Sequence, residues 1–260
     1  MIADEFLERG WTRFPVDPSV LDWLDAAEPA ARRAVDDPAY RQWHRCGGTW
    51  FAGVNALAND EAGAVPGGPP LRGEAVRFAE DMAGGPFAWD RAQVSVCWPG
   101  YPKQGDGESD ASFAYRRKRD AAHVDGLLPV GPDRRRFLRE HHRFILGLPA
   151  GPADAAASPL AVWEGSHRIV RETFAEAFGD TPPATWRELD VTGVYHALRR
   201  RIFADCRRVT VTAGRGEAYL VHRLALHGIA PWGADAKAAE RMVIYFRPES
   251  GDPAAWLNAG

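Results

Sequence analysis

The distribution of short apolar runs limits the fold more than any other feature of this chain. The first run, Gln93 to Trp98, alternates and carries Val94, Val96 and Trp98 on one face. Further runs lie at residues 144–148, 160–163, 209–212, 218–226 and 242–246. Several short strands separated by turn residues are typical of a double-sheet jelly roll. There is no β-α-β rhythm with a Gly-rich phosphate loop, so a nucleotide-binding parallel sheet is not indicated.

The residues before this region have helical spacing instead. Ser19 and Asp22 resemble a capping box that opens a helix, and we expect Pro29 to close it. A second helical run ends at Gly84-Gly85, and two more helices are expected near residues 170–178 and 194–202. The predicted fold class is therefore mostly β with flanking α: one domain over 1–260, with a helical N-terminal buttress at 1–90 and a jelly-roll core at 91–250.

Composition excludes several classes of protein. The formal net charge of -3 does not favour a nucleic-acid or anionic-membrane partner. No stretch reaches the roughly 18 apolar residues of a membrane span, and the charged N-terminus lacks the apolar core of a signal peptide. Cys46, Cys97 and Cys206 are few, odd in number and far apart, which argues against a disulfide framework. We expect a cytoplasmic globular protein.

The first candidate ligands form the pair His123-Val124-Asp125. Residues two apart on an extended strand point to the same face, so both side chains can reach one ion. In a chain with 8 histidines, one His-x-Asp pair can arise by chance. The pair alone is therefore a weak signal.

A second candidate ligand, His227, ends the apolar run 218–226 and is followed at once by Gly228. Glycine at this point lets backbone or ligand approach closely. His222 is an alternative ligand, although odd spacing on one strand would put it on the opposite face from His227.

Fourteen residues after His227, Arg241 opens the last apolar run. Its guanidinium can donate two parallel hydrogen bonds, which suits the binding of a carboxylate inside a barrel. Arg247, which follows that run, is the rival for this role. Two imidazoles and one carboxylate leave open positions on a metal, the arrangement typical of non-haem Fe(II) oxygen chemistry.

Three blocks together resemble the phytanoyl-CoA dioxygenase-like family of Fe(II)- and 2-oxoglutarate-dependent oxygenases. They are His123-Val124-Asp125, the segment Ser158 to Arg168 with its Gly-Ser-His ending, and Leu226-His227-Gly228. The resemblance implies a hydroxylase in which His123, Asp125 and His227 bind Fe(II) and are the catalytic centre. It further implies that Arg241 binds 2-oxoglutarate, and we expect Gln93 and Trp98 to line the co-substrate pocket.

Two other functions remain open from the sequence. One is a cupin-like metal protein, for instance a Zn(II) or Mn(II) isomerase, and the other is a non-catalytic binding or sensor module. Arg241 argues against the first, because a non-oxidative metal site does not need an arginine that binds a carboxylate. The complete set of three metal ligands argues against the second. The substrate is expected to be a small molecule. Basic runs at 116–119 and 134–136 flank the His-x-Asp pair and suggest that the substrate is anionic.

Overall fold

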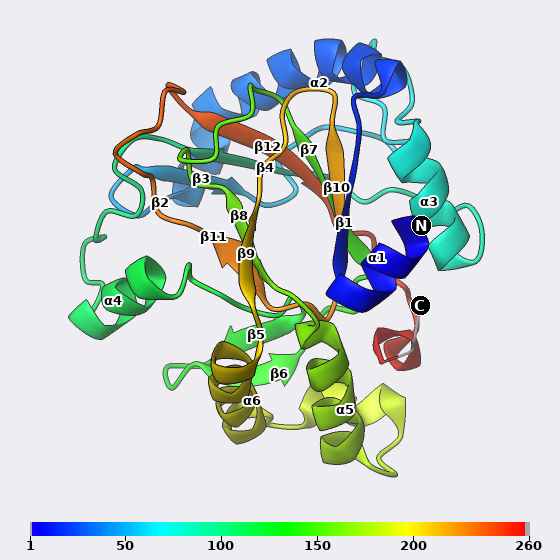
Figure 1. The fold of residues 1–260 in the computed structure, drawn as a ribbon, viewed down its shortest axis with the longest axis vertical. Helices are drawn as coiled ribbons and strands as arrows, with labels where there is room; N and C mark the ends of the chain where they lie inside the picture. The colour runs from blue at the N-terminus through cyan, green and yellow to red at the C-terminus, as the bar shows by residue number, and fades with distance from the viewer. Residues whose placement is uncertain (1, 258–260) are drawn as a thin grey trace.

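The computed structural model describes residues 2–257. Its elements pack as two facing sheets with helices on both sides (Figure 1). The helices are α1 (Ile2–Arg9), α2 (Pro18–Asp36), α3 (Glu74–Ala83), α4 (Asp110–Lys118), α5 (Ser166–Phe178) and α6 (Thr192–Asp205), with short 3-10 turns at Pro38–Trp43, Pro183–Glu188 and Pro253–Trp256. None of the described helices is long and apolar enough to cross a membrane.

The N-terminal helices agree with the sequence in part. Helix α3 ends at Gly84, whose left-handed conformation (φ 79°) terminates it as expected. Helix α2 differs, because its N-cap is Asp17 and it continues through Pro29 to Asp36. The expectation that Pro29 closes this helix was wrong. Ala27 before the proline and Ala31 and Ala34 after it are buried, so packing of this face offsets the local penalty.

Seven strands form the larger sheet, in the order β1-β10-β7-β12-β4-β3-β2. They are β1 (Trp11–Phe14), β2 (His44–Arg45), β3 (Trp50–Gly53), β4 (Gln93–Cys97), β7 (Phe144–Pro149), β10 (Ala218–His222) and β12 (Arg241–Phe246). The segment before residue 90 therefore adds three strands to this sheet as well as helices. Its helical character had been predicted, but its strands had not.

The smaller sheet has the order β11-β8-β9 and packs against the inner face of the larger one. Its strands are β8 (Leu160–Trp163), β9 (Arg208–Val211) and β11 (His227–Ile229), and β5 (Leu127–Val130) pairs with β6 (Arg135–Leu138) as a separate hairpin. All of these strand pairs are antiparallel. Two facing antiparallel sheets are consistent with the expected jelly-roll core.

One predicted strand, 218–226, is two elements in the structure. Strand β10 ends at His222, and the Ala225 amide donates to the His222 carbonyl in a tight turn. The chain then enters the smaller sheet at His227. The prediction of one continuous strand was wrong because apolar residues fill the turn as well: Leu224 and Leu226 pack on α5 and α6.

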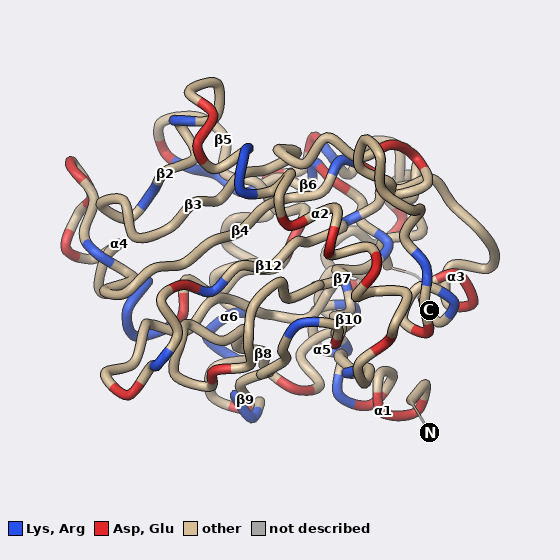
Figure 2. Tube along the Cα trace, turned by 90° about the horizontal axis from the view of Figure 1, so that it is seen from above, with Lys and Arg blue, Asp and Glu red and all other residues tan. Residues whose placement is uncertain are grey.

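Among the described residues, the three largest apolar clusters follow from this arrangement. One lies between the two sheets, one lies between the larger sheet and helices α2 and α3, and one lies beneath the smaller sheet against α5 and α6. Charged residues of both signs are mixed along the trace (Figure 2). Cys46, Cys97 and Cys206 are free thiols, as expected.

Candidate metal centre

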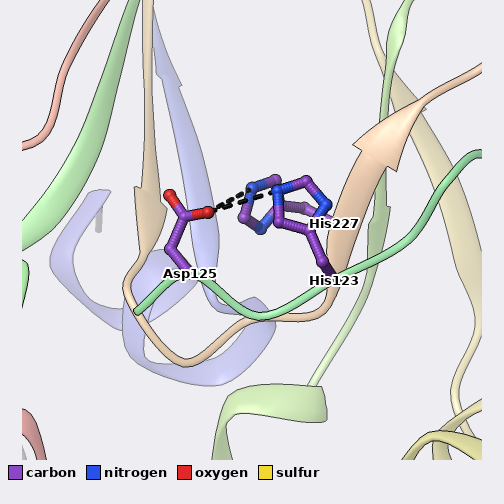
Figure 3. A group of neighbouring side chains, drawn as sticks. All are labelled: His123, Asp125 and His227. Carbon is purple, nitrogen blue, oxygen red and sulfur yellow. Dashed lines mark ion pairs between the residues drawn. The ribbon is translucent and has the colours of Figure 1, made fainter. Parts of the chain in front are cut away.

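The three predicted ligands meet at one point, although they come from two distant parts of the chain (Figure 3). His123 Nε2 lies 3.2 Å and His227 Nε2 lies 3.8 Å from Asp125 Oδ1. One ligand atom from each residue lies within 4.8 Å of the others. Asp125 and His227 are buried, whereas 48% of the His123 side chain is exposed. The group is therefore open to solvent on the His123 side.

The main chain brings the two histidines together. His123 and His227 form an isolated antiparallel bridge, and each backbone amide donates to the carbonyl of the other, at 2.8 and 3.0 Å. Ala122 and Val124 alternate with the ligands and pack on the opposite side, in the core beneath the smaller sheet. The expected sharing of one face by His123 and Asp125 is confirmed, on an extended segment rather than a full strand.

Gly228 makes this close approach possible. A Cβ at this position would lie 2.1 Å from the Asp120 carbonyl oxygen, which is far inside van der Waals contact. The Ile229 amide donates to that same oxygen. The glycine next to His227 thus allows the His123 segment to lie directly against β11, as the sequence indicated.

Both histidines present Nε2 to the shared centre. Nδ1 of His123 lies 3.1 Å from the Ala121 carbonyl, and Nδ1 of His227 lies 2.9 Å from the Ala225 carbonyl. A carbonyl can only accept, so each Nδ1 carries a hydrogen, and Nε2 is the ring nitrogen left to bind a metal. Burial lowers the pKa of His227 to about 4, which keeps its imidazole neutral.

Asp125 supplies the negative charge. Burial opposes ionisation, but the Arg247 guanidinium and the His123 ring hold the pKa of this carboxyl well below its usual range. Two imidazoles and one carboxylate form the donor set that suits a non-haem Fe(II) ion. The residues present therefore fit the metal that the sequence implied.

Arg241 lies on the inner face of the larger sheet, opposite Cys97 in the β12–β4 register. Its Nη2 donates to the hydroxyls of Tyr219 and Tyr245, at 3.2 and 3.1 Å. Its Nη1 is buried and has no hydrogen-bond partner in the described part of the chain. The adjacent Glu240 does not neutralise it, because Glu240 pairs with Arg32. A cation in this position needs an anionic partner.

Ser158 is a second unsatisfied donor in the same region. The residue is fully buried with a φ of 48°, and its Oγ has no hydrogen-bond partner among residues 2–257. Both Ser158 and Arg241 lie beside the Cys97 thiol. Our sequence analysis included Ser158 in a motif but assigned it no role, and only the Ser-Pro step marks it. Each of these buried donors would gain from a hydrogen-bond acceptor.

Gly147 provides the space for this site. A Cβ at residue 147 would lie 2.2 Å from the Tyr219 ring, so the ring lies directly over the glycine. Tyr219 then reaches across β7 to the Tyr245 hydroxyl, at 2.8 Å. The two phenols together hold Arg241 Nη2 and leave Nη1 free for a ligand.

The rival arginine lies elsewhere. Arg247 Nη1 is 3.5 Å from Asp125 Oδ2, the carboxylate oxygen that does not face the histidines. Its amide donates to Asp90 Oδ1 and its carbonyl accepts from His142 Nδ1. Arg247 is thus a neighbour of the metal ligand rather than of Tyr219 and Tyr245.

The remaining predicted residues separate. Gln93 pairs with Tyr245, so it lies on the β4 face toward the barrel interior. Trp98 packs with the outer core beneath α2 and donates to Glu240. The structure does not bring Gln93 and Trp98 together in one pocket, because residues five apart on an extended chain point to opposite faces of the sheet. His222 accepts from the Leu224 amide and stacks on His167, as a core histidine does.

The basic runs are largely engaged in contacts within the protein. Arg116 pairs with Glu108 at 2.9 Å, and Arg135 pairs with Asp190 at 3.1 Å. Arg119 lies over the ring of Phe203. The expected steering of an anionic substrate by these residues therefore stays a prediction.

No known family model and no curated protein matches the sequence. Solved structures do match. The chain has a TM-score of 0.58 to SnoK, a non-haem α-ketoglutarate-dependent carbocyclase of nogalamycin biosynthesis, with 14% identity over 95% of this chain and 82% of SnoK. The epimerase SnoN of the same pathway gives a TM-score of 0.53, with 16% identity over 94% of this chain and 79% of SnoN. AviO1 from Streptomyces viridochromogenes Tue57 gives a TM-score of 0.51, with 14% identity over 95% of this chain and 93% of AviO1.

These similarities are too low in identity to extend beyond the fold. They show a fold that this chain shares with the non-haem α-ketoglutarate-dependent enzymes SnoK and SnoN. SnoN has been solved in complex with Fe3+, α-ketoglutarate and nogalamycin RO. The narrower phytanoyl-CoA dioxygenase-like family has no support from a matching family model.

Proposed function

We propose that this protein is an Fe(II)- and 2-oxoglutarate-dependent oxygenase that acts on a small molecule. The observation that carries the proposal is Arg241, whose Nη1 is buried without a hydrogen-bond partner among residues 2–257, on the same fold as a His-Asp-His group. A metal site alone fits many proteins. A metal site with a separate unpaired carboxylate-binding group fits a co-substrate that has a carboxylate at its far end.

His123, Asp125 and His227 would hold the iron. Their arrangement suits this role, since both Nδ1 atoms are paired with carbonyls, which leaves Nε2 for the metal, and the pKa of the carboxyl is lowered. Asp125 offers Oδ1 to the metal while Arg247 contacts Oδ2. Bound Fe(II) together with 2-oxoglutarate supplies the oxidising chemistry.

Arg241 and Ser158 would hold the far carboxylate of 2-oxoglutarate. Arg241 Nη1 and Ser158 Oγ are both buried donors without partners, and a carboxylate has two oxygens to accept from them. Tyr219 and Tyr245 fix the guanidinium from the other side. Gln93, on the same face as Tyr245, would line the same pocket.

The reaction outcome is proposed to be hydroxylation of a C–H bond. Asp125 supports this, since related halogenases carry a small residue in place of the carboxylate. The relatives with similar folds include a carbocyclase and an epimerase, so the fold also serves other oxidative outcomes. We further propose that residues 1–260 are a single domain related to the phytanoyl-CoA dioxygenase-like family.

The two other functions explain fewer of these observations. A zinc or manganese isomerase has no use for a second carboxylate-binding group beside Cys97. A non-catalytic sensor has no need of two histidines whose Nε2 atoms are both kept free.

Anaerobic titration with Fe(II) and 2-oxoglutarate tests the proposal. We expect a weak visible charge-transfer band that requires both components, and slow succinate formation when air is admitted. At 2-oxoglutarate concentrations that give the band with the wild-type protein, Arg241→Ala should show no band. The variant should still bind Fe(II). No band and no succinate, together with activity of a zinc-loaded form, would favour the isomerase.

A further inference from the structure

The segment that carries His123 and Asp125 is held in an unfavourable conformation. Asp120 and Ala121, which precede it, both have left-handed φ values, 54° and 51°. Non-glycine residues in this region cost of the order of 1 kcal/mol or more each, and they persist only when surrounding contacts impose them. Arg208 supplies one such contact, with two hydrogen bonds of 2.6 and 2.9 Å to the buried Asp120 carboxylate. The backbone of residues 122–124, which follows, also needs contacts that fix its conformation.

Two tyrosine hydroxyls provide those contacts. Tyr115 of α4 donates to the Ala122 carbonyl at 2.7 Å, and Tyr195 of α6 accepts from the Val124 amide at 3.3 Å. Between them, the amide and carbonyl of His123 are both paired with His227. The main chain on each side of His123 is thus fixed by one phenol.

A stack of cations and rings orients the two tyrosines. The Arg199 guanidinium carbon lies 4.7 Å from the centre of the Tyr195 ring and 4.9 Å from that of Tyr115. Arg136 lies 5.5 Å from the Tyr195 ring. Arg199 Nη1 also donates to the Tyr115 hydroxyl at 2.7 Å, which directs the hydroxyl's own hydrogen to Ala122. The four residues link β6, α6 and α4 beneath the metal-binding segment.

We infer that Tyr115 and Tyr195 are positioning residues that hold the backbone of residues 122–124, so that His123 Nε2 faces Asp125 before a metal arrives. This inference rests on the proposed metal centre and adds two residues that touch neither metal nor substrate. Without a hydroxyl, the buried Ala122 carbonyl or Val124 amide loses its partner, and the strained segment can relax. Metal binding then has to restore the ligand geometry, which lowers affinity.

Tyr115→Phe and Tyr195→Phe test the inference, because each change removes one hydroxyl and keeps the ring that stacks on Arg199. Tyr40→Phe is the matched control, since the Tyr40 hydroxyl contacts only Arg91 in the N-terminal region. The probe is Co(II) under anaerobic conditions, followed by its ligand-field absorption. The measurements are the Kd for Co(II), the spectrum at saturation and the melting temperature of the metal-free protein.

We expect Tyr115→Phe and Tyr195→Phe each to weaken Co(II) binding by about tenfold. We also expect each to change the saturated spectrum, with Tyr40→Phe like the wild type. A merely structural role would lower the melting temperature and leave the saturated spectrum unchanged, and that result overturns the inference. If Tyr195→Phe fails to fold, the result for Tyr115→Phe, at a half-buried residue, tests the inference alone. If wild-type protein binds no Co(II), the proposed metal centre itself fails; unchanged binding in the variants overturns only the positioning role.

Discussion

His123 and His227 are each other's backbone partners as well as candidate ligands of one metal. Their amides and carbonyls exchange two hydrogen bonds, of 2.8 and 3.0 Å, and their ring centres lie 4.6 Å apart. The pairing is the antiparallel bridge that ties the segment after α4 to the smaller sheet. The distance between the two ligands is therefore set by main-chain geometry, and side-chain rotamers make only the final adjustment.

Gly228→Ala should disrupt this pairing. The new Cβ would lie 2.1 Å from the Asp120 carbonyl oxygen, so the His123 segment must move away from β11. We expect loss of Fe(II) binding, measured by anaerobic titration, and a lower melting temperature. The matched control is Gly193→Ala in α6, where no atom lies within 4 Å of the added Cβ. Wild-type metal affinity in Gly228→Ala would contradict the steric argument.

Arg241→Ala should raise the Kd for 2-oxoglutarate strongly. The change leaves the far carboxylate of the bound co-substrate without its buried cation. Breaking such a pair costs about 3–5 kcal/mol, so the loss is on the order of a hundredfold or more. Titration of the Fe(II)-loaded protein measures it. Arg247→Ala is the comparison, and we expect a much smaller change in 2-oxoglutarate affinity. The reverse ranking would mean that Arg247 binds the co-substrate.

Arg247→Gln should act on the metal instead. Arg247 Nη1 contacts Asp125 Oδ2 at 3.5 Å and favours the ionised carboxylate. Loss of a partner of a ligand side chain costs about 10–100-fold in metal affinity. We expect a weaker Kd for Fe(II), measured by competition with a chelator, while saturating iron restores normal 2-oxoglutarate affinity. Unchanged iron affinity would leave Arg247 with a role in packing only.

Asp125→Ala should abolish oxygenation. It removes the only carboxylate of the ligand set and leaves two imidazoles, so iron affinity should also fall substantially. Succinate formation and iron content measure the two effects. The wild-type protein, tested with chloride present, should give a hydroxylated and not a chlorinated product. Chlorination by the wild type would contradict the role proposed for Asp125.

Stability of the metal-free protein should fall as the pH is lowered from about 6.5 to 4. Burial lowers the pKa of His167 to about 4, so only the unfolded chain binds a proton in this window. Protonation then favours the unfolded state, by up to about 3 kcal/mol for this one residue. Urea unfolding at pH 7.5 and 4.5 measures the change. His167→Gln should show a smaller loss, and an equal loss would assign the pH dependence to other groups.

Local sequence patterns were sufficient to select the three candidate ligands and most strands. His123 and Asp125 are two residues apart, and His227 stands directly before a glycine. These relationships depend on backbone geometry over a few residues, which the sequence states directly. The alternation in β4 and the continuous apolar runs of β8 and β12 are likewise visible over a few residues.

Only the tertiary structure decided which groups meet across the chain. The sequence left Arg241 and Arg247 as rivals, because one opens the last apolar run and the other follows it. The register of β12 against β4 and the position of Tyr219 over Gly147 separate them. The turn after His222 was hidden, because Leu224 and Leu226 are buried by helices far along the chain. Strand register and helix packing depend on contacts between residues distant in sequence, and no local pattern specifies those.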